Sequence, residues 1–342
     1  MPTAFTLASA SVAPSGPAPR VVALRAPPVV AGRDELLAGL RVPNASIPPK
    51  YFYDTLGSAL FEAITELDEY YPTRAERSIL AACDREIAAA FGRPGCTLID
   101  LGAGNGEKAA RLFSALRPRE YVAVDISVEY LRRSLEALQS RFPHVVVTGV
   151  GADLVEPLDL PERIARHGRL FFYPGSSIGN FLPDEAQRFL AGLRALLDDT
   201  GGLLIGIDLA KDAQTLEAAY DDALGVTAAF NLNVLRHANR IAGTDFVLAD
   251  WRHVALFDAT HGRIEMHLEA RRAVRVTWPG GERRFAAGER IHTEDSYKCR
   301  LADFAELLGR AGFAVQGRWL DEHERFAVVL ARPERAWREQ DS

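Results

Sequence analysis

The sequence predicts an α/β fold in which a doubly wound, mostly parallel sheet is joined to a smaller α+β part. Five short apolar runs alternate with amphipathic segments between residues 95 and 210, as in a parallel sheet covered by helices. A glycine-rich turn at residues 102–106 follows the first run. After residue 210 the rhythm changes to hairpin-like runs, which indicates an insertion with a small sheet of its own.

The five apolar runs predict the buried strands of the main sheet. They lie at residues 96–101, 121–125, 145–150, 170–173 and 203–208. Each run is short and continuous, which is typical of strands that are buried on both faces. A predicted helix over 301–312 and an antiparallel pair at 313–319 and 326–331 complete this domain, so the domain resumes after the insertion.

The smaller part is predicted to combine N-terminal helices with the insertion. Helices are expected at 33–40 and 58–67, on either side of the aromatic run Tyr51-Phe52-Tyr53. For the insertion we expect a helix at 215–230, strands near 246–257 and 263–277, a Trp-Pro-Gly-Gly turn at 278–281, and a further strand-like run to residue 296.

These elements predict a division of the chain into six segments. The first is rich in Ala, Pro, Ser and Val with few aromatic anchors, so we expect it to be mobile. The segments are a mobile N-terminal arm (1–28), the helical part of the smaller domain (29–74), the main domain (75–210), the inserted part of the smaller domain (211–298), the closing part of the main domain (299–333) and a tail (334–342).

The composition argues against several classes of protein. Among 342 residues, 40 basic and 46 acidic side chains give a net charge of −6 without a basic stripe, so a nucleic acid has no electrostatic support as a partner. No apolar run is long enough to span a membrane. The 3 cysteines form no C-x-x-C pair and the 8 histidines no H-E-x-x-H pattern, which argues against a disulfide framework and against a metal site.

We therefore expect a cytoplasmic protein without a metal, acting on a small molecule. Organelle targeting stays open, because the chain has basic residues and no acidic residue before Asp34. A G-x-S-x-G elbow is absent, so a nucleophilic hydrolase has no candidate nucleophile.

The glycine-rich turn predicts a nucleotide-like ligand. Its spacing from Gly102 is G-x-G-x-G, which is neither the dinucleotide G-x-G-x-x-G nor a P-loop, so phosphate binding is disfavoured. Asp125 ends the next strand, where a ribose hydroxyl needs an acceptor, and Asp153 after the third strand can lie beside an adenine. The pattern suits a nucleoside without a pyrophosphate, such as S-adenosylmethionine. A nicotinamide cofactor and a purely structural turn are the alternatives.

Two further motifs predict a site for a small polar molecule. Asn180 follows the fourth strand, at the edge of the sheet where ligands bind, and its amide can hold an amine or a carboxylate. Glu294 and Ser296 lie two residues apart on a predicted strand and share a face, so they can hold the two nitrogens of an imidazole. The alternatives are a helix-capping asparagine and a solvated edge strand.

These motifs stand among a series of ordered blocks that resemble one family. The blocks include IPPKYFYD at 47–54, EYYPTR at 69–74, the Ile178-Gly179-Asn180 loop, AYDD at 219–222, GVTAAFN at 225–231, and Thr293-Glu294 with Ser296 and Lys298. Over residues 43–331 the sequence resembles the histidine Nα-methyltransferases of ergothioneine biosynthesis.

The resemblance implies a class I S-adenosylmethionine-dependent methyltransferase fold, with a Rossmann-like sheet and a substrate domain. The implied reaction is trimethylation of the α-amine of L-histidine to hercynine, with S-adenosylhomocysteine as the second product. We separately expect a monomer. The implied cofactor residues are Gly102, Lys108, Asp125, Ala152 and Asp153. The implied histidine residues are Tyr70, Asn180, Tyr220, Glu294 and Ser296, with Tyr53 and Asn180 as the catalytic pair beside the amine.

The sequence departs from the family pattern at two places. Asn105-Gly106 stands where many relatives have serine or threonine, and Tyr297 replaces a smaller residue beside the substrate serine. Phe52 and Tyr53 are expected to offer aromatic faces to the methylated, cationic amine. The alternatives are an Nα-methyltransferase for another amino acid or small amine, a nicotinamide-dependent oxidoreductase, and a non-catalytic amino-acid-binding module.

Overall fold

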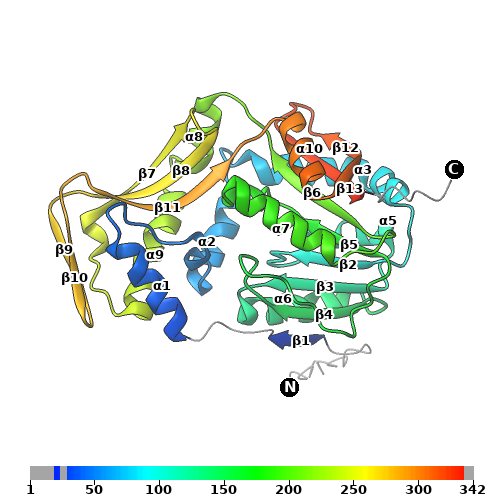
Figure 1. The fold of residues 1–342 in the computed structure, drawn as a ribbon, viewed down its shortest axis with the longest axis horizontal. Helices are drawn as coiled ribbons and strands as arrows, with labels where there is room; N and C mark the ends of the chain where they lie inside the picture. Colours follow the sequence, from blue (N-terminus) through cyan, green and yellow to red (C-terminus); the bar gives the residue numbers. More distant parts are fainter. Residues whose placement is uncertain (1–18, 24–28, 335–342) are drawn as a thin grey trace, which may run out of the picture.

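The main sheet of the computed structural model, which describes residues 19–23 and 29–334, has eight strands (Figure 1). Six strands are parallel, and the last two are antiparallel to their neighbours. Their order across the sheet is β1 (Arg20–Ala23), β4 (Val146–Gly151), β3 (Glu120–Asp125), β2 (Thr97–Leu101), β5 (Arg169–Tyr173), β6 (Gly202–Asp208), β13 (Phe326–Pro333) and β12 (Phe313–Leu320). The five predicted strands and the closing antiparallel pair are confirmed, with small shifts at their ends.

One correction concerns the predicted N-terminal arm. Residues 20–23 form strand β1, which pairs in parallel with β4 at the edge of the sheet. These four residues alternate poorly between polar and apolar, so the sequence carries no strand signal there beyond a short run of valines. The remainder of the predicted arm, at 1–18 and 24–28, and the tail after residue 334 lie outside the described residues.

Helices cover both faces of the sheet, and each face has its own hydrophobic core. Strands buried on both sides explain why the sequence shows continuous apolar runs instead of alternation. One face carries α3 (Tyr71–Phe91), α4 (Glu107–Ala110), α5 (Phe113–Leu116) and α6 (Val128–Arg141). The other carries α7 (Pro183–Ala195) and α10 (Leu301–Arg310).

A second lobe contains the N-terminal helices and the insertion, which share one hydrophobic core drawn from residues 36–71 and 216–291. Figure 1 shows this lobe beside one end of the strands of the main sheet. Its helical elements are α1 (Val29–Arg41), η1 (Pro49–Phe52), α2 (Thr55–Thr65), α8 (Ala213–Tyr220), α9 (Val226–Ala242) and η3 (Leu248–Asp250). Its strands are β7 (Trp251–Asp258), β8 (Arg263–Ala270) and β11 (Arg290–Tyr297) in one sheet, and β9 (Val274–Trp278) and β10 (Gly281–Phe285) in another.

Two predicted elements of the insertion are divided in the structure. The helix predicted at 215–230 is two helices, because Asp222 accepts hydrogen bonds from the first N–H groups of α9 and Gly225 adopts a left-handed conformation with φ 73°. The strand predicted at 263–277 is likewise β8 and β9, which belong to different sheets. The first division has a consequence for the site, since it leaves Tyr220 at the end of α8.

Within the part of the chain that the structure describes, no helix combines the length and the apolar character needed to cross a membrane.

Gly206 in β6 gives a test of how closely helix α3 packs against the main sheet. A Cβ at this position would lie 2.1 Å from Oε1 of the buried Glu76 of α3, whereas a Cβ at Gly192 of α7 would meet nothing within 4 Å. We expect Gly206→Ala to lower the free energy of unfolding by roughly 2 kcal/mol through overpacking. Gly192→Ala, the matched control, should leave it unchanged or raise it, since alanine favours a helix. Denaturant unfolding of both variants measures this, and equal effects would contradict the account.

Candidate active site

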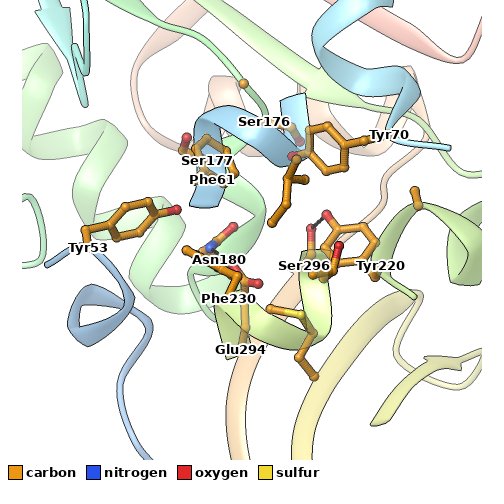
Figure 2. Close-up of a pocket in the computed structure, with 15 residues that line it drawn as sticks. Tyr53, Phe61, Tyr70, Ser176, Ser177, Asn180, Tyr220, Phe230, Glu294 and Ser296 are labelled. Atoms are coloured by element: carbon orange, nitrogen blue, oxygen red, sulfur yellow. Dashed lines mark hydrogen bonds between the residues drawn. The ribbon is translucent and has the colours of Figure 1, made fainter. Parts of the chain in front are cut away.

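A cavity between the two lobes brings the predicted substrate and catalytic residues together (Figure 2). All six of these predicted residues line it: Tyr53, Tyr70, Asn180, Tyr220, Glu294 and Ser296. The loop after β5, helices α2, α8 and α9, and strands β8 and β11 all contribute to its wall. The site therefore lies at the carboxyl ends of the parallel strands, as in other open α/β sheets.

Asn180 and Glu294 form one corner of the cavity. The Asn180 side-chain amide donates to Oε1 of Glu294 at 2.5 Å, and Glu294 is only 8% exposed. The loop that bears Asn180 can approach β11 because residue 179 is a glycine: a Cβ there would lie 2.8 Å from the carbonyl oxygen of Tyr297 in β11. Burial raises the pKa of Glu294 to about 7, although Asn180 and Lys298 act to lower it.

Ser296 and Tyr220 form the opposite corner, and Lys298 lies behind them. The Ser296 and Tyr220 hydroxyls are 2.7 Å apart, and the Lys298 ammonium donates to Ser296 at 2.7 Å and to Tyr220 at 3.0 Å. Glu294 and Ser296 point into the same cavity, as the i, i+2 spacing predicts. The sequence did not predict that Ser296 is paired with Tyr220 and a buried cation.

The charge of Lys298 is held by Asp208 at the end of β6. The two side chains are 3.0 Å apart and each is 1% exposed. Lys211 and the Tyr71 hydroxyl also donate to Asp208, at 2.6 and 2.8 Å. Burial alone would lower the pKa of Lys298, but Asp208 and Tyr220 raise it above its ordinary value. Lys298 is therefore a permanent cation at physiological pH.

An aromatic wall faces the polar corners. It consists of Tyr53, Phe61 and Phe230, whose ring centroids lie 5.7 to 5.9 Å from one another. The expectation that Phe52 offers a face to the ligand is wrong: Phe52 is fully buried and stacks behind Phe230 at 4.6 Å. Figure 2 shows the Tyr53 hydroxyl directed toward Asn180. Burial raises the pKa of Tyr53 well above its ordinary value, so this hydroxyl stays protonated.

Thr227 is a pocket residue that the site prediction missed. It lines the cavity at the start of α9, and among the described residues its buried hydroxyl has no hydrogen-bond partner. A buried hydroxyl without a partner is costly, so this atom is available to a ligand. The only sequence signal for it was its place in the block at 225–231.

The predicted cofactor residues lie beside this cavity, around the glycine-rich turn. Gly102, Gly104 and Gly106 all have positive φ, from 54° to 73°, and a Cβ at Gly102 or Gly104 would meet nothing within 4 Å. The turn therefore presents open backbone, to which a ligand can come close. Asp125 accepts hydrogen bonds from the N–H groups of Gly104 and Ser127 at 2.9 and 2.8 Å, which fixes its carboxylate at the turn.

Lys108 is joined to a carboxylate that sequence reasoning did not single out. Its ammonium donates to Oε2 of Glu76 at 2.7 Å, and Glu76, which is fully buried, also accepts from the N–H of Gly175 at 2.9 Å. Lys108 itself keeps a third of its side chain exposed. The Lys108–Glu76 pair connects the helix that follows the glycine-rich turn to the loop that bears Asn180.

Ala152 and Asp153 follow β4. The N–H of Ala152 donates to the carbonyl of Asp125, and Asp153 accepts from Lys50 of η1 at 3.0 Å. Lys50 also lies 2.9 Å from Glu35 of α1, so this ion pair links the second lobe to the cofactor side of the sheet. The sequence predicted the place of Asp153 near the cofactor but not its partner.

The residues present suit a nucleoside that carries no pyrophosphate. An open glycine turn, a fixed acidic residue at the end of β3 and a partly exposed lysine stand at one edge of a doubly wound sheet. This fold and site define a class I S-adenosylmethionine-dependent methyltransferase.

Comparisons with known proteins identify the family. The model of the histidine-specific, S-adenosylmethionine-dependent methyltransferases matches residues 32–333. The histidine N-alpha-methyltransferase of Mycolicibacterium smegmatis is 41% identical over 87% of this chain and 94% of that protein. The chain therefore belongs to the histidine-specific methyltransferase family, and its methyl donor is S-adenosylmethionine.

Two fungal proteins are more distant relatives: one is much longer than this chain, and the other is named simply as an N-methyltransferase. Ergothioneine biosynthesis protein 1 of Neurospora crassa is 34% identical over 84% of this chain, which matches 33% of that longer protein. The N-methyltransferase imqF of Aspergillus flavus is 28% identical over 84% of this chain and 81% of that protein.

The raised pKa of Glu294 predicts how stability depends on pH. Between pH 4.5, its ordinary value, and about 7, the folded state holds a proton that the unfolded chain has lost, so stability falls as the pH rises through this window. We expect Glu294→Gln to raise the melting temperature of the ligand-free protein at pH 8 by roughly 2–5 °C, and much less at pH 5. Calorimetry at both pH values measures this. A gain as large at pH 5 as at pH 8 would contradict it.

Proposed function

We propose that this protein transfers three methyl groups from S-adenosylmethionine to the α-amine of L-histidine, giving hercynine for ergothioneine biosynthesis. The observation that carries the proposal is the divided polarity of the cavity. The corner of Glu294 and Asn180 offers hydrogen-bond acceptors, and the corner of Ser296, Tyr220 and Lys298 offers a donor. An imidazole ring with one N–H and one bare nitrogen complements both corners.

The bound cofactor supplies a methyl group on its sulfonium. The chain has to align the amine, keep water away from it and receive its proton. Asn180 and Tyr53 are proposed to orient the amine, because both line the cavity and the Tyr53 hydroxyl is directed toward Asn180 (Figure 2). Tyr70, whose ring meets that of Tyr220 edge to face at 6.2 Å, is proposed to hold the carboxylate and nearby waters.

Little basic strength is required of the protein. Free α-amino groups titrate near ~8, so a useful fraction of the substrate is neutral at physiological pH. Tyr53 stays protonated, which makes it a hydrogen-bonding relay for the departing proton and not the final base. The growing positive charge on the methylated amine is stabilised by the aromatic wall, by about 0.5–2 kcal/mol for a cation over a ring.

The second candidate is methylation of another amino acid or small amine. Relatives such as imqF match most of this chain, but they are named only as N-methyltransferases, without mention of histidine. This similarity is the observation that favours the second candidate. Glu294 favours histidine, since an apolar side chain would leave its buried carboxyl without a partner.

Mass spectrometry of the purified protein with S-adenosylmethionine and each of the 20 amino acids tests the proposal. We expect trimethylated histidine to accumulate, together with S-adenosylhomocysteine. Trimethylation of a different amino acid would replace the substrate but keep the chemistry. The absence of methylation with all of them would contradict the proposal and favour an amino-acid-binding module.

Replacement of Glu294 tests the imidazole corner directly. We expect Glu294→Ala to lower kcat/KM for histidine roughly 100-fold while the KM for S-adenosylmethionine changes less than about threefold. Asp295→Ala is the matched control, because this neighbour on β11 pairs with His292 and Arg263 and is not among the residues lining the cavity. It should keep kcat/KM for histidine within about threefold of wild type. An equal loss of kcat/KM for histidine in the two variants would contradict a role for Glu294 in binding the substrate.

The proposal extends to a monomeric, cytoplasmic enzyme. Three free cysteines and a net charge of −6 without a basic stripe support a reducing compartment and no nucleic acid partner. Light scattering of the purified protein and fractionation of the host cell test these two points; a stable dimer or a membrane-bound fraction would contradict them.

A further inference from the structure

Lys298 lies outside the cavity wall, yet it determines which hydrogen-bond groups the wall presents. An ammonium has three N–H groups. The structure gives Lys298 three partners, namely Asp208 at 3.0 Å, Ser296 at 2.7 Å and Tyr220 at 3.0 Å. Every donor of the ammonium is therefore in use, and both hydroxyl oxygens accept from it.

The remaining hydroxyl protons can then be counted. Ser296 and Tyr220 carry one hydroxyl proton each, and the contact of 2.7 Å between the two oxygens uses one of them. If Tyr220 donates to Ser296, the Ser296 proton is free; if Ser296 donates, the Tyr220 proton is free. In both cases one O–H remains for the cavity, while most lone pairs of the two oxygens are already engaged. This corner is a donor and a poor acceptor.

The opposite corner has the reverse character. When Glu294 is ionised, Asn180 donates to one of its oxygens, which leaves the other carboxylate oxygen as an acceptor for the ring and the Asn180 carbonyl oxygen for the amine. Glu294 and Ser296 are two residues apart on β11, about 7 Å along the strand, a span that a five-membered ring between two hydrogen bonds can bridge. The ring that fits has a proton on one nitrogen and a lone pair on the other.

We propose that Lys298 is a specificity-determining positioning residue, which fixes the Ser296–Tyr220 pair as a donor so that the site takes the substrate imidazole in its neutral form. The inference rests on the proposed histidine methylation. An imidazolium would bring a second N–H to a corner that already carries a free O–H and a buried cation. It is rejected there by the lack of an acceptor and by like charge. Lys298 touches no substrate atom itself and acts through the two hydroxyls.

Substrate analogues separate this role from a structural one. The two pyrrolylalanines, attached through ring position 2 or 3, each keep one ring N–H and replace the other nitrogen with C–H. We expect Lys298→Met to lower kcat/KM for histidine and to reduce the preference for histidine over the better pyrrolylalanine by about tenfold. Loss of the positioning cation should penalise only the substrate that uses the free O–H.

Lys211→Met is the matched control. Lys211 also pairs with Asp208, at 2.6 Å, but no hydrogen bond in the described part of the chain joins it to Ser296 or Tyr220. Its replacement should change the rates with both substrates by the same factor and leave their ratio unchanged. Asp208 keeps Lys211 and Tyr71 as partners in Lys298→Met, which favours a folded variant.

Three outcomes distinguish the possibilities. The ratio that decides is kcat/KM for histidine divided by kcat/KM for the better pyrrolylalanine. A reduced ratio in Lys298→Met and an unchanged ratio in Lys211→Met support the inference. An unchanged ratio in a folded Lys298→Met protein overturns it, while the wild-type reaction with histidine still stands. If Lys298→Met does not fold, the double variant Lys298→Met/Asp208→Asn, which also removes the buried carboxylate charge, must show a reduced ratio, and a wild-type ratio there overturns the inference equally. A wild-type protein that leaves histidine unmethylated would instead defeat the proposed function.

Discussion

The buried ion pair between Lys298 and Asp208 is the interaction on which the site depends. It joins the end of β6 in the main sheet to the residue after β11 in the second lobe, at 3.0 Å and with both side chains 1% exposed. Replacing one partner of such a pair leaves a buried charge, so the two elements are held in one arrangement. Tyr220 from α8, Tyr71 from α3 and Lys211 all attach to the same pair. The substrate corner is thus built on the seam between the lobes.

Close backbone contacts complete that seam. Gly179 lets the loop after β5 lie against Tyr297 of β11 across this seam, and within the main domain Gly206 leaves room for the carboxylate of Glu76. Glu76 in turn holds Lys108 beside the cofactor loop and the N–H of Gly175 beside the substrate loop. The residues proposed to bind the cofactor and those proposed to bind the substrate therefore share supports, which is what alignment of an amine with a sulfonium methyl requires. Catalysis in this fold is mainly a matter of position and less of acid or base strength.

Much of this could be predicted from the sequence, and the failures have physical reasons. Continuous apolar runs placed the central strands, because strands buried on both faces need no alternation. Local spacing placed Glu294 and Ser296 on one face. In contrast, spacing does not predict that Ser296 pairs with Lys298, because this depends on how the two side chains are oriented. Nor does it predict that Lys108 pairs with Glu76, because these residues lie far apart in the sequence. Phe52 stands beside Tyr53 in the sequence but does not reach the cavity, because packing turns it inward, and Phe61 of α2 lines the aromatic wall instead.

We infer that the cavity divides into a donor corner and an acceptor corner, which together accept a neutral imidazole. Nitrogen NMR of ring-labelled histidine, bound to the protein together with S-adenosylhomocysteine, tests this most directly because it reports the protonation of each ring nitrogen. We expect two distinct signals, one from a protonated nitrogen and one from a nitrogen with a free lone pair. Two protonated nitrogens would mean that an imidazolium is bound, which would contradict the account.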